Sequence, residues 1–223
     1  MDPTAFILRE TAPIAPPLVP ELRLHLATAV TPLWEATERT LERQGVPPPY
    51  WAFAWAGGQA LARFLLDHPD RVAGRRVLDF GAGSGLVALA AARAGARAEA
   101  ADIDPLALAA IALNAALNGL SVTIRGDDLI GADEGWDTVL VGDMCYERPL
   151  AARLVPWLRA LAGRGAEVLL ADPGRAYKPE DGLAELARYA VKVDRDLEDR
   201  DVRETVVYRL AAAAAASGSS TMR

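Results

Sequence analysis

Residues 75–85 read RRVLDFGAGSG, an apolar run that ends in a turn with three glycines. The run is typical of a short buried strand, and residues 86–94, which follow the turn, are typical of a helix. Glycines in such a turn let the chain reverse tightly and let a ligand approach the backbone. Asp79 lies two residues before the first glycine, and Leu86 stands where the dinucleotide fingerprint G-x-G-x-x-G ends in Gly or Ala. The stretch predicts a strand, a ligand-binding turn and a helix, although such a turn can also serve packing alone.

Strands and helices alternate on the C-terminal side of this turn. The predicted strands are residues 75–80, 97–102, 122–125, 138–142 and 167–171, and the predicted helices are residues 54–67, 86–94, 105–118, 149–161 and 180–189. Two further strand-like runs, residues 191–196 and 204–210, are joined by a connection too short for a helix, so we expect an antiparallel hairpin. The alternation predicts an α/β fold in which a parallel sheet carries helices on both faces. A Rossmann-like seven-stranded sheet closed by such a hairpin resembles the class I methyltransferases.

The ends of the chain are less regular. The first 20 residues hold five prolines and little periodicity, so we expect an irregular arm there. Residues 21–43 are expected to be helical in part, with a break at Pro32. The predicted organisation is an N-terminal arm and helical segment over residues 1–48, one domain over residues 49–210, and a flexible tail over residues 211–223.

The composition is that of an ordinary globular protein. The 223 residues are 52% hydrophobic and 24% charged, which excludes disorder of the whole chain. The net charge of −6 argues against a nucleic-acid partner. Arginines interrupt the apolar stretches, and no basic segment precedes an apolar one at the start, so we expect no membrane partner and no signal peptide.

The counts of cysteine and lysine suggest the cellular location and the source of the protein. Cys145 is the single cysteine, which excludes an internal disulfide and a cysteine-based zinc site, and we expect a cytoplasmic location. Only two of the 24 basic residues are lysines, which, with the many alanines, suggests a bacterial genome rich in G and C.

The glycine turn resembles the loop that binds S-adenosylmethionine, which has no pyrophosphate. An acid such as Asp79 can there face the ammonium group of the ligand. Asp102 ends the second predicted strand, 21 residues after Gly81, and its carboxylate can accept both ribose hydroxyl protons. Because NAD has the same ribose, Asp102 does not distinguish the two ligands. Asp104 precedes Pro105 and is expected to cap the next helix.

Two acids follow the third predicted strand. Either Asp127 or Asp128 can accept a hydrogen bond from an adenine amino group, and we prefer Asp127. The alternative is turn chemistry, since Asp and Gly both favour turns.

Residues 142–146 (GDMCY) end the fourth predicted strand, where sheets of this class hold the acceptor. An acid beside an aromatic ring suits an amine acceptor. Asp143 is expected to orient the amine, and Tyr146 to wall its methylene stem by packing or cation–π contact. The alternative is that Asp143 caps the next helix and Tyr146 belongs to the core. Cys145 has no histidine near it in the sequence, so we expect no catalytic thiol.

An aromatic segment and an arginine turn complete the candidate site. Residues 50–55 hold four aromatic side chains, and Trp51 and Trp55 are spaced to share one face of a helix. Such a cluster is either core or a lid beside the cofactor turn. Arg175 lies in the turn over residues 172–175 (DPGR) and is either a solvated charge or a group that steers an acidic partner.

With these motifs the chain resembles the lysine methyltransferases that act on the β-subunit of electron transfer flavoprotein, which carry D-x-x-Y/F after strand four. The resemblance covers residues 18–210 and rests on residues 20–24 (PELRL), 48–52 (PPYWA), 55–61 (WAGGQAL), 79–85, 102–105 (DIDP), 142–146 and 172–175. It implies a protein-lysine N-methyltransferase that uses S-adenosylmethionine and takes the flavoprotein β-subunit as its partner.

The expected site combines three sets of residues and no metal. The catalytic set is Asp143 and Tyr146, the cofactor set is Trp55, Asp79, Gly81, Gly83, Asp102, Ile103 and Asp127, and the substrate set is Tyr50, Trp51, Met144 and Arg175. Three alternatives stay open: a small-molecule N-methyltransferase for a nicotinamide-like amine, an NAD(P)-linked dehydrogenase, and a binding module without turnover. Leu86 and the terminal hairpin count against the dehydrogenase. We expect a monomer.

Overall fold

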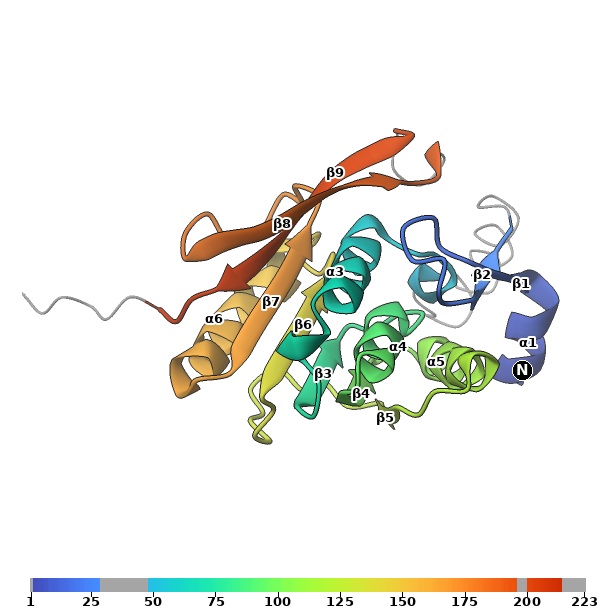
Figure 1. Cartoon of the computed structure of the whole chain (residues 1–223), viewed down its shortest axis with the longest axis horizontal. Coiled ribbons are helices and arrows are strands. Elements are labelled where there is room, and N and C mark those ends of the chain that lie inside the picture. Colours follow the sequence, from blue (N-terminus) through green and yellow to red (C-terminus); the bar gives the residue numbers. More distant parts are fainter. Residues whose placement is uncertain (1, 29–47, 196–199, 214–223) are drawn as a thin grey trace, which may run out of the picture.

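The computed structural model describes residues 2–28, 48–195 and 200–213, and its centre is a single seven-stranded sheet (Figure 1). The parallel strands are β3 (Arg76–Phe80), β4 (Arg97–Ala101), β5 (Thr123–Arg125), β6 (Thr138–Gly142) and β7 (Glu167–Asp172). The last strands, β8 (Leu183–Lys192) and β9 (Val202–Leu210), form an antiparallel hairpin. The order is β5-β4-β3-β6-β7-β9-β8, and β9 runs antiparallel to β7. The predicted α/β sheet with a terminal hairpin is confirmed.

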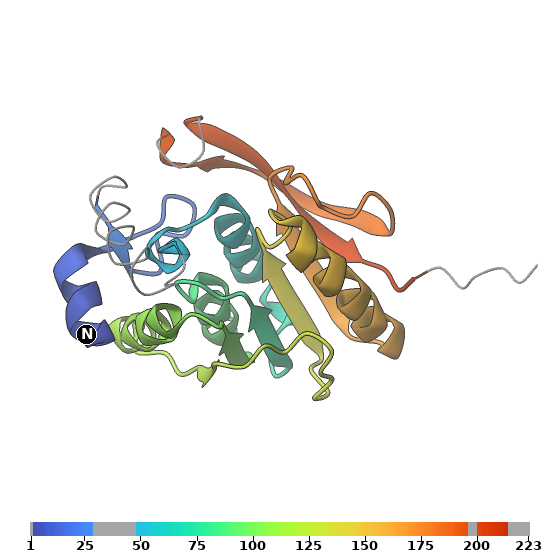
Figure 2. The ribbon, with the colours of Figure 1, turned by 180° about the vertical axis from the view of Figure 1, so that it is seen from behind.

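Helices cover both faces of this sheet. The helices are α3 (Ala56–Asp67), α4 (Leu86–Arg93), α5 (Pro105–Asn118) and α6 (Arg148–Arg164), with short 3-10 turns at η1 (Tyr50–Ala52) and η2 (Pro69–Arg71). Figure 1 shows α3 and α4 in front of the strands, and Figure 2 shows α6 on the other side. In β3, Val77 packs with the apolar side chains of α3 and α4, whereas Leu78 packs with those of α6. Successive residues of a strand point to opposite faces, so both faces of β3 are buried.

Local signals set the bounds of α5, which match the prediction. Asp104 accepts a hydrogen bond from the backbone N–H of Leu106 over 2.8 Å, Pro105 occupies the first helical position, and Gly119 ends the helix with φ +63°. Among the described residues, no helix has the length and apolar character needed to cross a membrane.

The expected helix over residues 180–189 is wrong, because this segment belongs to strand β8. Its sequence is rich in Ala, Leu and Glu, which favour helices. Pairing with β9 over the whole strand, from Leu183 opposite Leu210 to Lys192 opposite Val202, outweighs that local preference. The hairpin therefore begins earlier than the predicted strand at residues 191–196.

The expected irregular arm at the start is also wrong. Residues Pro3–Glu10 form helix α1, because Pro3 suits a first helical position and Asp2 accepts a hydrogen bond from the backbone N–H of Thr4 over 3.0 Å. Two strands, β1 (Thr11–Ile14) and β2 (Leu24–Ala27), then pair antiparallel. Part of the predicted helical segment is thus a strand, and residues 29–47, with Pro32, lie outside the described residues.

Polar side chains hold the N-terminal unit, formed by α1, β1 and β2, on the domain. Asn118 of α5 accepts from the backbone N–H of Arg23 over 3.0 Å and donates to its carbonyl over 2.6 Å. Arg63 of α3 pairs with Glu21 at 2.6 Å.

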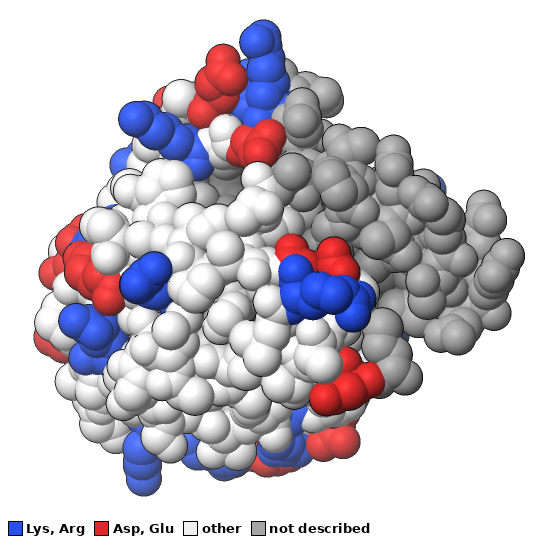
Figure 3. Space-filling view, turned by 90° about the vertical axis from the view of Figure 1, so that its right-hand side faces the viewer, with Lys and Arg blue, Asp and Glu red and all other residues white. Residues whose placement is uncertain are grey.

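Figure 3 shows the side of the molecule on which α1 lies. On this side the charged side chains are scattered around a broad area that has none.

Candidate active site

The ends of four parallel strands meet at one edge of the sheet. Phe80 of β3 is opposite Ala101 of β4 and Val141 of β6, and Gly142 of β6 is opposite Ala171 of β7. The strand order reverses at β3, which has β4 on one side and β6 on the other. Ligands of open α/β sheets bind outside the strand ends at such a reversal. The predicted site residues lie in or just after β3, β4, β5, β6 and β7, in η1, or at the start of α3.

The glycine turn between β3 and α4 is fastened by Asp102. Gly81 and Gly83 have φ of +68° and +53°, which side chains with a Cβ rarely adopt. A Cβ at Gly81 would overlap the sulfur of Met144, in the loop after β6. Asp102 follows β4 and accepts from the backbone N–H of Gly83 over 2.8 Å and of Asp104 over 3.0 Å. The turn is therefore a backbone cradle with a carboxylate at its rim.

Asp79 is a buried carboxyl beneath this cradle. Its side chain is 2% exposed and accepts from the backbone N–H of Ala88 in α4 over 2.9 Å. Burial and, secondarily, the negative charge of Asp102 raise the pKa of Asp79 to about 7. A positively charged ligand group nearby would favour its ionised form.

Two further cofactor candidates, Ile103 and Asp127, lie on the surface. Ile103 is 72% exposed, which is unusual for a large aliphatic side chain and offers an apolar face beside the cradle. Asp127 is exposed and pairs with Arg125 at 3.2 Å. Its neighbour Asp128 accepts from the backbone N–H of Ile130 over 3.1 Å, which is the turn role considered for this pair of acids.

Asp143 is held at the end of β6 by groups from two other elements. It is 8% exposed, and its φ of +57° makes it the one non-glycine residue with positive φ in the described ranges. Its Oδ2 accepts from the backbone N–H of Gly57 in α3. Its Oδ1 accepts from Arg175 Nε, after β7, over 2.9 Å, and Arg175 Nη2 forms an ion pair with the same oxygen at 2.7 Å. The predicted acceptor carboxylate is thus oriented by the fold before any substrate is present.

The first turn of α3 reaches Asp143 because residue 57 is a glycine. A Cβ at Gly57 would lie 2.5 Å from Asp143 Oδ2 and 2.7 Å from the carbonyl oxygen of Ala171. The carboxylate therefore lies against the N-terminus of a 12-residue helix, whose dipole stabilises an anion by about 0.3–1 kcal/mol.

Arg175 is an internal partner and not the solvated or partner-steering charge that the sequence suggested. Asp172 Oδ1 accepts from the backbone N–H groups of Gly174 and Arg175, each over 2.6 Å, which fixes the turn. The guanidinium carbon lies 5.8 Å from the centre of the Trp55 ring. The sequence does contain a signal for the pair with Asp143, because the two residues follow neighbouring parallel strands by one and three positions.

Aromatic rings gather beside Arg175, the partner of the carboxylate. The ring of Tyr50 lies 5.8 Å from that of Trp55 and 5.6 Å from that of Tyr146, between centres, and Trp55 Nε1 donates to the carbonyl of Tyr50 over 2.8 Å. Tyr146 is 38% exposed, so this group opens to the surface. The arrangement brings together three of the predicted rings.

Trp51 belongs to the core and not to this group. Its side chain is 1% exposed and packs at 6.4 Å from the ring of Phe6 in α1, among apolar side chains of α5. Trp51 and Trp55 do not share a helical face, because η1 ends at Ala52 and α3 begins at Ala56. The expected contact of Trp51 with substrate is therefore not what the structure shows.

The loop after β6 contains no reactive base or thiol at neutral pH. Cys145 is fully buried, and burial with the nearby charge of Asp172 raises its pKa to about 12. Burial also raises the pKa of Tyr146 to about 12, with a smaller contribution from Tyr50. Both groups stay protonated, so they can shape the site but cannot act as a nucleophile or a base there. Met144 belongs to this loop, and its side chain lies against the glycine turn, because a Cβ at Gly81 would overlap its sulfur.

Comparisons with known proteins define the class first. A family model for "Ribosomal protein L11 methyltransferase (PrmA)" matches residues 60–140. Magnesium protoporphyrin IX methyltransferase from Synechocystis PCC 6803, solved with bound SAM, is similar with a TM-score of 0.52 at 18% identity, covering 69% of this chain and 78% of that chain. A putative RNA methyltransferase from Pyrococcus horikoshii gives 0.53 at 16% identity, covering 80% and 96%. The fold is that of the class I methyltransferases, a class that uses S-adenosylmethionine.

The family is shown by closer relatives. The electron transfer flavoprotein beta subunit lysine methyltransferase of Xenopus laevis is 40% identical over 214 residues, covering 92% of this chain and 86% of that protein. The protein of the same name from Homo sapiens is 44% identical over 165 residues, covering 71% of this chain and 61% of that protein. The chain belongs to the electron transfer flavoprotein β-subunit lysine methyltransferase family.

The residues of the cradle fit the cofactor of this class. A Cβ at Gly81 would overlap Met144, and Gly83 adopts a positive φ that favours glycine. Asp102 presents a carboxylate suited to ribose hydroxyls, and Ile103 offers an exposed apolar surface to a base. The buried carboxyl of Asp79 suits a cationic group. When bound, S-adenosylmethionine supplies a methyl group that is already activated on a positively charged sulfur.

Proposed function

We propose that this chain methylates the ε-amine of a lysine in the β-subunit of electron transfer flavoprotein. The observation that carries the proposal is the buried carboxylate of Asp143, which Gly57 and Arg175 fix at the end of β6, with the ring of Trp55, a neighbour of Tyr50, next to that arginine. A carboxylate beside aromatic rings suits an amine on an aliphatic stem. The names of the curated relatives support the flavoprotein subunit as the substrate.

The residues of the chain act mainly by alignment. Asp143 accepts a hydrogen bond from an N–H of the incoming amine, so that the nitrogen lone pair is free to face the cofactor side. Tyr146 and Tyr50 pack along the methylene stem and limit the access of water. Aligning two reactants in this way is worth about 7–11 kcal/mol in favourable cases. Asp143 need not be a strong base, because the amine can lose its proton to solvent before it is aligned.

The open rim of the site suits a protein acceptor. Tyr146 is partly exposed and borders the route to Asp143, so a long lysine side chain on another protein can reach the carboxylate while its backbone stays outside. The proposal also takes the enzyme to be a cytoplasmic monomer that acts without nucleic acid or membrane, in keeping with its net charge of −6.

The test is intact-mass spectrometry of purified electron transfer flavoprotein after incubation with the enzyme and S-adenosylmethionine. We expect increments of one methyl mass on the β-subunit with the wild type and none with Asp143→Asn. Asparagine tolerates positive φ, so this variant keeps the backbone and removes the charge. Calorimetry should show that it still binds S-adenosylmethionine.

Two outcomes would contradict the proposal. Loss of cofactor binding together with transfer would remove Asp143 from the acceptor site. A wild-type enzyme that binds the cofactor but methylates only nicotinamide or simple amines would instead be a small-molecule N-methyltransferase.

A further inference from the structure

The acceptor carboxylate has a cationic partner built into the chain. Arg175 Nε donates to one oxygen of Asp143 over 2.9 Å, and Nη2 lies 2.7 Å from the same oxygen as an ion pair. The other oxygen accepts from the backbone N–H of Gly57. Asp143 and Arg175 together therefore carry no net charge in the place where the acceptor amine is expected.

This pairing bears on a chemical difficulty of amine methylation. A lysine ε-amine has an ordinary pKa of about 10.4, so it arrives as an ammonium ion, which has no lone pair and cannot accept a methyl group. A buried carboxylate without a partner would raise that pKa, because an opposite charge favours the charged form. Asp143 alone would thus bind the acceptor firmly in its unreactive form.

We infer that Arg175 is a positioning residue that neutralises Asp143, so that the acceptor site selects the lysine as a neutral amine. The inference rests on the proposed lysine acceptor and deepens it. With Arg175 in place, Asp143 still offers an oxygen to an N–H group, but the site gains little by keeping the extra proton. The amine nitrogen then bonds to the methyl carbon as the carbon–sulfur bond breaks and its electron pair stays on sulfur, and the methylated ammonium releases a proton to water.

The geometry suits arginine more than lysine at this position. A guanidinium presents Nε–H and Nη2–H in one plane, whereas an ammonium is a compact point charge. Asp172 fixes the backbone of the turn, and the ring of Trp55 lies 5.8 Å from the guanidinium carbon. The charge of Arg175 is therefore held at the carboxylate and does not depend on a freely moving side chain.

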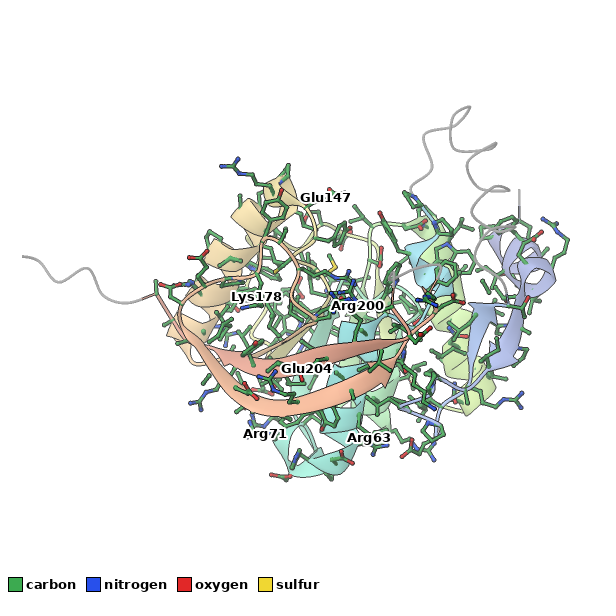
Figure 4. All side chains as sticks on the ribbon, turned by 90° about the horizontal axis from the view of Figure 1, so that it is seen from above. Arg63, Arg71, Glu147, Lys178, Arg200 and Glu204 are labelled. Atoms are coloured by element: carbon green, nitrogen blue, oxygen red, sulfur yellow. The ribbon has the colours of Figure 1, made fainter. Side chains whose placement is uncertain are left out.

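Few other groups around the site titrate in the same pH range. Among the described residues, the titratable groups around Asp143 are Tyr50 from η1, Cys145, Tyr146 and Glu147 after β6, Asp172, Arg175 and Lys178 from β7 and the loop after it, and Asp79 and Asp102 from β3 and β4. The first turn of α3 contributes backbone N–H groups and no titratable side chain. In Figure 4, Glu147 and Lys178 lie on one side of the β8–β9 hairpin and Arg63 and Arg71 on the other.

Lys178 is directed elsewhere, since its Nζ lies 5.1 Å from the centre of the Tyr208 ring. Cys145 and Tyr146 have pKa values of about 12, and Asp79 has one of about 7. Because these groups are present in the wild type and in the Arg175 variants alike, a difference between their pH profiles reports the acceptor site.

The experiment compares Arg175→Gln and Arg175→Lys with the wild type, and uses Arg188→Gln as a matched control. Arg188 is exposed on β8 and pairs with Glu185 at 2.7 Å and with Glu204 of β9, neither of which is a site residue. Single-turnover methylation of electron transfer flavoprotein is followed between about pH 7.5 and about pH 10, and calorimetry measures the affinity for the unmethylated flavoprotein at the lower pH.

For Arg175→Gln we expect the pH of half-maximal rate to rise by about one unit, which lowers the rate roughly tenfold at the lower pH. The same variant should bind the unmethylated flavoprotein as tightly as the wild type or more tightly, because the ammonium form is now stabilised. Arg175→Lys keeps the positive charge, so its pH profile should stay near that of the wild type while its maximal rate falls. Arg188→Gln should match the wild type in both measurements.

A rate for Arg175→Gln that falls by the same factor at every pH would overturn the inference, since a purely structural role predicts that result. If Arg175→Gln does not fold, Arg175→Lys decides, because a shifted profile in a variant that keeps the charge contradicts neutralisation. A wild-type enzyme that leaves the flavoprotein unmethylated at every pH would overturn the proposed function and this inference with it.

Discussion

Asn114 in α5 joins the N-terminal strand β2 to the glycine turn. Its Oδ1 accepts from the backbone N–H of His25, 89 positions away in the sequence, over 2.7 Å. Its Nδ2 donates to the carbonyl of Ser84 over 2.8 Å. The side chain is fully buried, so both hydrogen bonds replace contacts with water. The N-terminal unit is therefore mechanically connected to the backbone that forms the cofactor cradle.

Replacing Asn114 with Ala should lower both stability and cofactor affinity. It leaves the N–H of His25 and the carbonyl of Ser84 buried without this partner, at a cost of about 1–3 kcal/mol for each group. We expect the free energy of unfolding in urea to fall by roughly 2–4 kcal/mol. Calorimetric titration should show weaker binding of S-adenosylmethionine, because the turn at Ser84 is no longer held. Asn118→Ala is the control, since Asn118 holds Arg23 but does not reach the turn. An equal loss of cofactor affinity in that control would contradict the coupling.

Gly57 and Gly58 offer a matched pair of helical glycines with opposite expectations. An Ala at residue 57 would place its Cβ 2.5 Å from Asp143 Oδ2 and 2.7 Å from the carbonyl oxygen of Ala171, so the carboxylate must move. At residue 58 the nearest atom is Val87 Cγ2 at 4.0 Å. We expect Gly57→Ala to lower kcat for methylation about 100-fold, as a displacement of about 1 Å at an acceptor site can do. Gly58→Ala should keep activity and gain about 0.5–1 kcal/mol of stability, measured by urea unfolding. Near-normal activity of Gly57→Ala would show that Asp143 need not be held in this place.

The strand, turn and helix around Asp79, and the bounds of α5, could be predicted because local residues set them. Asp104 and Gly119 cap α5 through their own backbone neighbours. Strand β8 could not be predicted, because its composition favours a helix and only its pairing with β9 makes it extended. Sequence spacing alone cannot weigh a contact of that kind against local propensity.

In the candidate site, too, some residues could be predicted from the sequence and others could not. Asp143 and Tyr146 could be placed from the position of β6, whereas their partners could be predicted only once the order of the strands is known. The pair of Asp143 with Arg175 spans 32 positions and depends on β6 and β7 being neighbours. Trp51 was predicted to contact substrate, but it is buried against Phe6 of helix α1. The prolines near the start of the chain favoured an irregular arm there, so this helix was not predicted.

The cofactor-free protein should lose stability as pH rises through neutrality because of Asp79. Its pKa is raised to about 7 in the folded state from an ordinary 3.8, mainly by burial. A group with a raised pKa stabilises the fold fully at acidic pH, and this contribution is lost as pH rises through the folded value. Between about pH 5.5 and about pH 8.5 the loss amounts to roughly 2 kcal/mol. Urea unfolding of wild type and Asp79→Asn across this range isolates the contribution.

The variant Asp79→Asn should show less of this pH dependence and should be the more stable protein at the alkaline end. It should also bind S-adenosylmethionine more weakly, because a neutral amide no longer attracts a cationic group. Parallel stability curves for the two proteins would show that Asp79 does not titrate in this range.

The role assigned to Tyr146 separates its ring from its hydroxyl. Because the pKa of Tyr146 is raised to about 12, the phenol stays neutral and cannot take a proton from the amine at working pH. We therefore expect Tyr146→Phe to keep kcat/KM within about twofold of the wild type, since the ring beside Tyr50 is retained. Tyr146→Ala removes the wall next to Asp143, lets water in and loosens the methylene stem, which should lower kcat/KM by about 10–100-fold. Steady-state methylation of the flavoprotein measures both, and calorimetry of S-adenosylmethionine binding shows whether the loss lies at the acceptor site or at the cofactor site. A Tyr146→Phe variant as inactive as Tyr146→Ala would mean that the hydroxyl, and not the ring, contacts the acceptor.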